Sequence, residues 1–155
     1  MKKTLFILLS VTLICCSIFC FPVGAVANTP NKDTTIEKLE NGDYIETIIT
    51  YYETDDKAAT KSGSKTRNYK NSDGVTLWSV TVNGTFTYNG TTSSCTKSTH
   101  STSVSASNWS IKSSSSSKSG NCATATATAT HKQILTSKDY TISVNLYCSP
   151  YGILS

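Results

Sequence analysis

The chain has 155 residues, of which 37% are hydrophobic and 15% charged. This length suits one domain with an adequate core and requires no second domain. The formal net charge of +4 falls to +2 once Lys2 and Lys3, which lie in a segment expected to be removed, are left out. So small a charge gives no basis for binding nucleic acid or an anionic membrane.

The first segment has the three parts of a secretory signal peptide. Lys2 and Lys3 precede an apolar run over residues 5–21, and the small residues 25–27 follow as a cleavage site. The run is short for a membrane anchor. We therefore predict a signal peptide over residues 1–27, a secreted protein, and no membrane span in the mature chain.

An acidic leader with one probable strand is expected over residues 28–64. Residues 28–56 hold eight acidic and two basic residues (−6), and residues 57–155 hold ten basic and two acidic residues (+8). Residues 28–43 are polar and predict a mobile leader or at most one helical turn. Residues 44–53 are rich in β-branched and aromatic side chains and predict a strand. Three interpretations of the acidic segment stay open: it lies against the basic remainder, it is a solvated leader, or it is a removable segment that masks a basic face.

The remaining residues, 65–155, are expected to form a β-sandwich core. A strand over 65–70 is followed by a turn composition at 71–74. Over residues 75–88 apolar side chains fall on alternate positions, and period two over that length indicates one buried face. Gly84 interrupts the row and predicts a bulge, a bend or a break into two strands.

The second half of this core is richer in hydroxyl residues. Asn89-Gly90 predicts a hairpin turn, residues 102–107 and 108–112 predict short strands, and residues 113–117 predict a loop. Residues 139–149 alternate between an apolar and a polar face and predict a half-buried strand. Several strands at short spacing with no convincing helix predict an antiparallel β-sandwich, immunoglobulin-like, with about six to eight strands.

Residues 122–130 alternate alanine and threonine without a break, so a pleated strand segregates them onto opposite faces. Burying the threonine face would cost about 1–3 kcal/mol for each hydroxyl left unpaired, whereas alanine carries no such penalty. We expect the alanines to face the core. The threonine row resembles an ice-binding face, but a single row is not a surface, and threonine is a good exposed strand former.

Three cysteines remain in the mature chain, an odd set in an oxidising compartment. Cys148 continues the core row of its strand, whereas Cys122 shares the threonine face. This favours a disulfide between Cys95 and Cys148, which would contribute about 4 kcal/mol in the chain-entropy model. Cys122 is then a free thiol, and we expect a monomer or a Cys122-linked dimer.

Three stretches resemble a group of small secreted β-rich proteins of Gram-positive bacteria that has no assigned activity: KNSDGVTLWSVTVNGTFTYNGTTSSC, SGNCATATATAT and NLYCSPYG. The likeness covers about residues 65–155. It implies that Cys95 and Cys148 are the shared pair and that Cys122 is an extra thiol. The resemblance implies a secreted location and a β-rich fold, and it implies no activity.

No set of residues predicts a catalytic, metal or cofactor site. His100 and His131 are the only imidazoles in the sequence, and there is no GxSxG elbow, HExxH pair or P-loop. The scattered cysteines and histidines lack metal-ligand spacing. Four acids that can mimic a glycosidase pair are interpreted as charged surface: Glu46, Glu53, Asp55 and Asp56.

These observations favour a non-enzymatic extracellular binding or interaction module for an unknown extracellular ligand or cell-envelope component. Tyr51, Tyr52 and Tyr69 can form an exposed aromatic platform, with ordinary strand packing as the alternative. Two other functions stay open. One is a secreted antimicrobial or toxin-like protein with an acidic masking leader, and the other is a small secreted hydrolase, which needs His100 or His131 in a cleft beside an acid and a hydroxyl.

Overall fold

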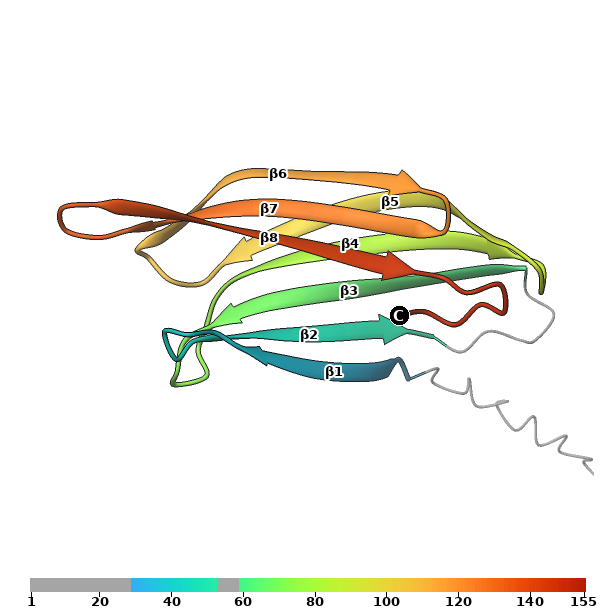
Figure 1. Ribbon diagram of the computed structural model, residues 1–155, viewed down its shortest axis with the longest axis horizontal. Coiled ribbons are helices and arrows are strands. Elements are labelled where there is room, and N and C mark those ends of the chain that lie inside the picture. The colour runs from blue at the N-terminus through green and yellow to red at the C-terminus, as the bar shows by residue number, and fades with distance from the viewer. Residues whose placement is uncertain (1–28, 53–58) are drawn as a thin grey trace, which may run out of the picture.

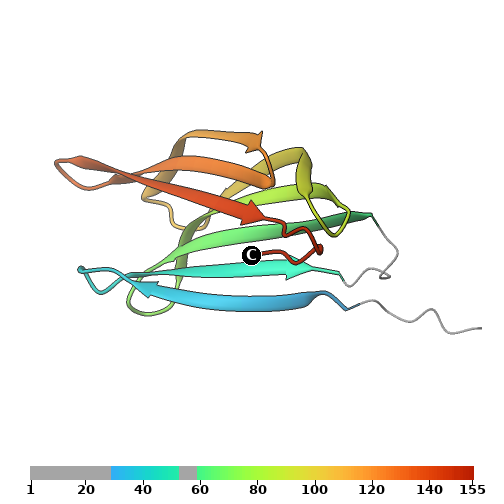
Figure 2. The same ribbon diagram turned by 45° about the vertical axis from the view of Figure 1, so that its right-hand side comes forward.

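A computed structural model describes residues 29–52 and 59–155. The expected signal peptide, residues 1–27, and the acids Glu53, Asp55 and Asp56 lie outside these residues. The described chain consists of eight strands in two antiparallel sheets that pack against each other (Figures 1 and 2). Within the described ranges no helix is long and apolar enough to cross a membrane.

Both sheets keep their strands in chain order. The five-stranded sheet contains β1 (Asn31–Lys38), β2 (Tyr44–Tyr51), β3 (Thr60–Lys70), β4 (Thr76–Tyr88) and β5 (Ser93–Val104). The three-stranded sheet contains β6 (Trp109–Ser119), β7 (Cys122–Lys132) and β8 (Ser137–Tyr147). The predicted antiparallel β-sandwich is confirmed. The sequential order lacks the interleaved strands of an immunoglobulin domain.

The expectation of a mobile leader or a helical turn at residues 28–43 is wrong. Residues 31–38 are β1, paired with β2 from Asn31–Tyr51 to Lys38–Tyr44. All side chains of β1 are exposed, so no alternation of burial marks the strand in the sequence, and backbone hydrogen bonds to β2 hold it. The turn at Gly42, with φ of 85°, connects the two strands. The expected division at residue 64 lies inside β3.

Residues 113–117, expected to form a loop, lie in the middle of β6. This strand pairs with β7 from Trp109–His131 to Ser119–Cys122. It is an edge strand whose side chains are mostly exposed, so hydroxyl residues are tolerated at nearly every position. A run of serine therefore conceals a strand whose backbone is fixed by its neighbour.

The apolar row of β4 is confirmed, and the strand is not broken at Gly84. This glycine pairs with Gly63 of β3 and Ser98 of β5. The Phe86 ring covers it so closely that an added Cβ would lie 2.5 Å from Cε2 of that ring. A register shift lies one step further along β4, between Thr85 and Phe86, but the extra residue is Thr96 of the partner strand β5 and not a residue of β4.

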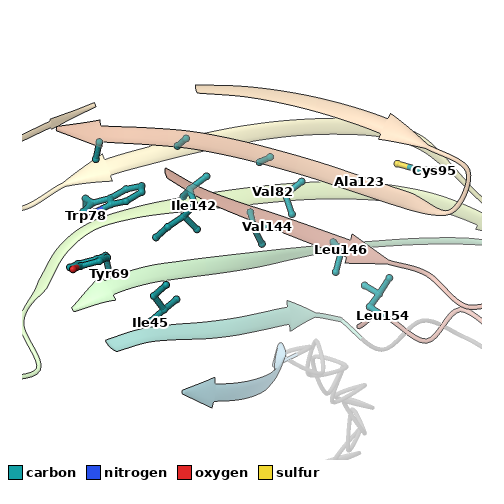
Figure 3. Packing of buried hydrophobic residues seen from close by; sticks show 14 of the residues in the cluster. Ile45, Tyr69, Trp78, Val82, Cys95, Ala123, Ile142, Val144, Leu146 and Leu154 are labelled. Carbon is teal, nitrogen blue, oxygen red and sulfur yellow. The ribbon is translucent and has the colours of Figure 1, made fainter. Parts of the chain in front are cut away.

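The core fills the space between the sheets (Figure 3). The buried face of β7 consists of alanine, with each side chain at most 1% exposed, and the threonines lie on the other face. The expected orientation of residues 122–130 is thus confirmed. Across the core, the small alanine side chains face larger ones from β4, and within their own sheet they lie beside larger ones from β8. These larger side chains are Trp78, Val80, Val82 and Phe86 of β4, and Ile142, Val144 and Leu146 of β8.

Aromatic rings fill one end of this core. The Trp109 ring centroid lies 5.3 Å from that of Tyr69 and 5.1 Å from that of Tyr140, and Trp78 stacks at 6.3 Å. The other end is closed by Leu154, whose Cδ1 lies over Gly63, where a Cβ would meet it at 2.4 Å. One end is therefore filled by aromatic side chains from both sheets, and the other by a side chain of the C-terminal segment that follows β8.

The alanine face gives a direct stability test. Replacement of Ala127 by Leu should destabilise the fold by about 1–3 kcal/mol in urea denaturation, because the larger side chain overpacks the space between the sheets. Thr126→Ser, one residue away on the outer face, keeps the hydroxyl that bonds Ser143 and should change the stability by less than about 0.5 kcal/mol. Equal losses in the two variants would contradict the assignment of faces.

Candidate functional site

The two sheets have unequal widths, so part of the larger sheet has no strand above it. β8 is the edge strand of the smaller sheet and packs over β3 and β4, whereas β1 and β2 lie beyond it (Figure 1). A groove of about 510 Å³ lies in this place, between the edge of β8 and the inner faces of β1, β2 and β3. Three charged side chains line it: Asp33, Lys65 and Arg67.

The floor of the groove combines cationic and neutral side chains. Lys65 and Arg67 lie two residues apart on β3, and therefore on the same face of the sheet. In the register of the sheet, Lys65 is followed across the strands by Ile49 and Asp33, and Arg67 by Thr47 and Thr35. The groove thus changes from basic at β3, through neutral at β2, to acidic at β1.

Arg67 connects three strands. Its Nη2 donates to Glu37 Oε2 of β1 at 2.5 Å, and its Nη1 donates to the backbone oxygen of Ser143 in β8 at 3.2 Å. The guanidinium group has five donors in a fixed planar arrangement, which suits such a bridge. Arg67 therefore holds the two sheets together at the mouth of the groove.

Lys65 has no such partner. Among the described residues, no carboxylate oxygen lies within ion-pair distance of its Nζ. Partial burial, and then the charge of Arg67, lower the pKa of Lys65 below its ordinary value. The groove therefore contains a half-buried ammonium group that an incoming anion would stabilise.

The edge of β8 presents backbone groups to the same groove, and one of them, the Ser143 carbonyl, already accepts a hydrogen bond from Arg67 Nη1. Tyr147 exchanges both backbone hydrogen bonds with Ser155, at 2.9 and 3.1 Å, so its N–H and C=O point away from β7. Because this direction alternates along an antiparallel strand, the backbone groups of Thr141, Ser143 and Asn145 point the same way. The part of β8 that precedes Tyr147, and so does not pair with Ser155, has the arrangement of backbone groups that can accept another strand.

The sequence interpretation did not find this groove. Its visible signal is the alternation of β3, where Lys61, Lys65 and Arg67 occupy positions of one face while Tyr69 continues that face into the core. Charged residues at inward positions of a strand conflict with a sandwich core. Such a conflict is expected where a surface has a function.

The three described cysteines lie around the β6–β7 turn. The backbone N–H groups of Cys95 and Cys148 donate to the carbonyls of Gly120 and Asn121, and Cys122 begins β7. All three are free thiols, so the expected Cys95–Cys148 disulfide is absent from the structure. Burial raises the pKa of both the Cys95 and Cys148 thiols, which keeps them protonated. Cys122 is half-exposed beside Thr124 on the threonine face, as expected.

Each histidine contacts neutral partners. The two ring nitrogens of His100 lie 3.1 Å from the hydroxyls of Ser116 and Ser114, so the ring bridges β5 and β6. The His131 ring stacks on Trp109 with a centroid distance of 4.6 Å, and its Nε2 lies 2.9 Å from Asn108 Nδ2. No described contact of either ring is a carboxylate. The acid, histidine and hydroxyl arrangement of a hydrolase is therefore not assembled at these contacts.

The candidate tyrosines do not form one platform. Tyr69 is buried among the core aromatics, Tyr51 is half-buried beneath Lys61 Nζ at 5.1 Å, and Tyr52 is exposed. Burial, chiefly, raises the pKa of Tyr69 to about 12. The expected aromatic platform is thus wrong for Tyr69, because its ring completes the core at the end where Trp109 lies.

Glu46 forms a charged contact on the outer face of the larger sheet. It accepts hydrogen bonds from Asn68 at 2.9 Å and from Lys70 at 3.0 Å. These two hydrogen bonds lower the pKa of its carboxyl. Together with the Glu37–Arg67 pair, this contact joins the acidic segment to the basic β3, as the opposite charges of the two parts suggest.

The threonine face extends over three strands rather than one. Thr124, Thr126 and Thr128 of β7 hydrogen-bond Asn145, Ser143 and Thr141 of β8, each at 2.9 Å. Exposed serines of β6 continue the face on the other side of β7. The expectation of a single row is therefore wrong, because neighbouring strands supply further rows. The threonine hydroxyls bond their neighbours and fix the register of β8.

Comparisons with known proteins add no relative to this description: no protein-family model, curated protein or solved structure matches the chain. Among the described residues, no group of three or more potential metal ligands is found. The choice of the groove between β8 and β1–β3 as the candidate site therefore depends on the geometry of the groove alone.

Replacement of Lys65 tests whether this cation serves the fold. Lys65→Met should raise the unfolding free energy by about 0.5–2 kcal/mol at neutral pH, since it removes an uncompensated charge. A lowered pKa means that the folded state binds the proton less tightly than the unfolded state does. The destabilisation of the folded state by the charged Lys65 is therefore fully present at pH values below the pKa of the folded state. The difference between variant and parent should shrink as the pH rises toward the unfolded value of about 10.4.

The matched control is Lys97→Met, which removes an exposed lysine of β5. Its stability should stay within about 0.5 kcal/mol of the parent. Urea denaturation at several pH values measures both variants. A destabilised Lys65→Met protein would show that the ammonium group has a partner that stabilises the fold.

Proposed function

We propose that the protein is an extracellular, non-enzymatic binding module whose groove takes an extended, acidic peptide segment as an additional strand on β8. The observation that carries this proposal is the edge of β8 above the uncovered inner face of β1 and β2, where the Ser143 N–H and the backbone groups of Thr141 and Asn145 have no partner among the described hydrogen bonds. The extracellular address rests on the signal peptide predicted from the sequence.

The geometry of the sheets supports this mode of binding. The smaller sheet has three strands and the larger has five, and strands lie about 4.8 Å apart within a sheet. A fourth strand beside β8 would therefore lie over β2. The chain itself begins this pairing, since Leu154 forms a β-bridge with Cys148 and Ser155 pairs with Tyr147. A bound segment would continue the same line along Asn145, Ser143 and Thr141.

The charges of the groove favour an acidic segment. The added strand would direct alternate side chains toward the floor, where Lys65 lacks an anionic partner among the described residues. An aspartate or glutamate at that position would form a charge-assisted hydrogen bond with the ammonium group. Backbone pairing would supply affinity, and Lys65 and Ile49 would select the side chains.

Two other functions have less support. A hydrolase would need an acid beside His100 or His131, and their described contacts are serine, asparagine and tryptophan. A toxin with a masking leader would release its basic face after cleavage between residues 57 and 65. That cleavage would remove β1 and β2, which are paired strands of the larger sheet. The groove needs both of them.

Selection from phage-displayed linear peptides tests the binding mode, with the chain from residue 28 onward as bait. Selected peptides should alternate in polarity and carry an acidic residue. In calorimetry, Lys65→Met should weaken binding of a selected synthetic peptide by about tenfold to a hundredfold. The amides of Thr141, Ser143 and Asn145 should gain protection from hydrogen exchange when the peptide is bound.

A pair of substitutions at one position separates backbone pairing from side-chain contacts. Ser143→Pro removes an outward N–H that the β7–β8 ladder does not use, and an edge strand tolerates proline. It should abolish peptide binding with the fold retained. Ser143→Ala keeps the N–H and should bind like the parent. Failure to select any peptide, or equal binding by both Ser143 variants, would contradict strand addition.

A further inference from the structure

The turn between β7 and β8 carries the most exposed apolar side chains of the described chain. Ile134 is 100% exposed and Leu135 is 92% exposed, so neither side chain packs against the protein. The hairpin projects beyond the end of the sandwich (Figures 1 and 2). Its tip is about 25 Å along β8 from Ser143, at about 3.3 Å per residue, and therefore belongs to another surface than the groove.

The residues at this tip contradict the turn chemistry used elsewhere in the fold. The turns of the hairpins β1–β2, β3–β4, β4–β5 and β6–β7 contain Gly42, Gly74, Gly90 and Gly120, each with a positive φ. The β7–β8 turn has Ile134 and Leu135 between Gln133 and Thr136, which are joined by a backbone hydrogen bond of 2.8 Å. Hairpin turns favour asparagine and glycine over branched apolar residues. Two aliphatic residues in this place serve neither the turn nor the core.

Cationic side chains surround the tip. Lys132 precedes the loop and Lys138 follows it, and both are exposed. Lys132 continues the threonine face of β7, whereas Lys138 lies on the opposite face, with its Nζ 5.1 Å from the Tyr140 ring centroid. The acid nearest in sequence, Asp139, already binds Lys112 and Thr130. Among the described residues, neither Lys132 nor Lys138 has an ion-pair partner.

We infer that the tip of the β7–β8 hairpin inserts Ile134 and Leu135 into the surface of a lipid bilayer that contains anionic headgroups. The two aliphatic side chains reach the acyl boundary, and Lys132 and Lys138, one on each face of the hairpin, meet the headgroup phosphates. Exposed aliphatic residues with flanking cations are the combination by which peripheral proteins bind such surfaces. The net charge of the whole chain gave no sign of this, because the charge complementarity is local to the hairpin.

Vesicle co-sedimentation tests the inference with the chain from residue 28 onward, which contains every described strand. The probes are vesicles of phosphatidylcholine alone and of phosphatidylcholine mixed with phosphatidylglycerol. The protein should partition onto the mixed vesicles, and added salt should weaken the binding. Replacement of both Lys132 and Lys138 by glutamine should lower this partition by about twenty-fivefold, at about fivefold for each lysine.

The apolar contribution is tested by a variant designed to keep the hairpin. Ile134→Asn combined with Leu135→Gly installs a favoured turn pair, so the fold should be retained, while partition onto mixed vesicles should fall by at least tenfold. Ile36→Ser, which removes an exposed aliphatic residue of β1, is the matched control and should bind like the parent. Circular dichroism and thermal unfolding report the fold of each variant.

Three results would overturn the inference. The first is that the parent protein fails to bind mixed vesicles, and the second is that the Asn-Gly variant binds them as well as the parent. The third is a concentration-dependent dimer, seen by light scattering, that the Asn-Gly variant loses while neither protein binds vesicles. That result would assign the tip to contact between two copies of the chain.

Discussion

The fold depends on the close approach of two sheets, and the alanine face of β7 permits it. Bulky side chains from β4 and β8 fill the core, and almost no volume on β7 competes with them. Each large apolar side chain that is buried stabilises the folded state by about 1.5–3 kcal/mol relative to the same side chain exposed to water. Interiors packed at this density tolerate few added methylenes. The small side chains of β7, the central strand of the smaller sheet, therefore leave the space that Trp78, Phe86 and their neighbours occupy.

The same alternation places the polar half of β7 where it organises the functional surfaces. Each threonine from Thr124 to Thr130 hydrogen-bonds a polar side chain of β8, so side chains as well as backbone fix the register between the two strands. That register determines which backbone groups of β8 point toward the groove. It also determines that Lys132 and Lys138 lie on opposite faces near the hairpin tip. Groove and tip thus both depend on one strand pair.

Much of this architecture is visible in the sequence, and the exceptions have physical reasons. Period-two patterns in β4, β7 and β8, and the Asn89-Gly90 turn, predicted strands with the correct buried faces. β1 and the second half of β6, from residue 113 onward, escaped detection because they lie in edge strands with few buried side chains, where the backbone hydrogen bonds to the neighbouring strand leave no pattern in the sequence. The groove was not predictable because it arises from the unequal widths of two sheets, and sequence patterns do not determine how strands divide between sheets. Ile134 and Leu135, by contrast, could have been recognised from the sequence, because two aliphatic residues are unusual in a hairpin turn.

Thiol labelling along β7 tests the central constraint most directly. A Cys122→Ser background keeps the buried thiols of Cys95 and Cys148, so labelling of a cysteine introduced at position 126 or 127 is followed by mass spectrometry of the β7 peptide. The two positions are adjacent and lie on opposite faces of the strand. The cysteine of Thr126→Cys should react with a thiol reagent as fast as an exposed thiol does, and that of Ala127→Cys only as fast as the protein unfolds. Equal rates, or faster reaction at position 127, would contradict the packing of the two sheets through the alanine face.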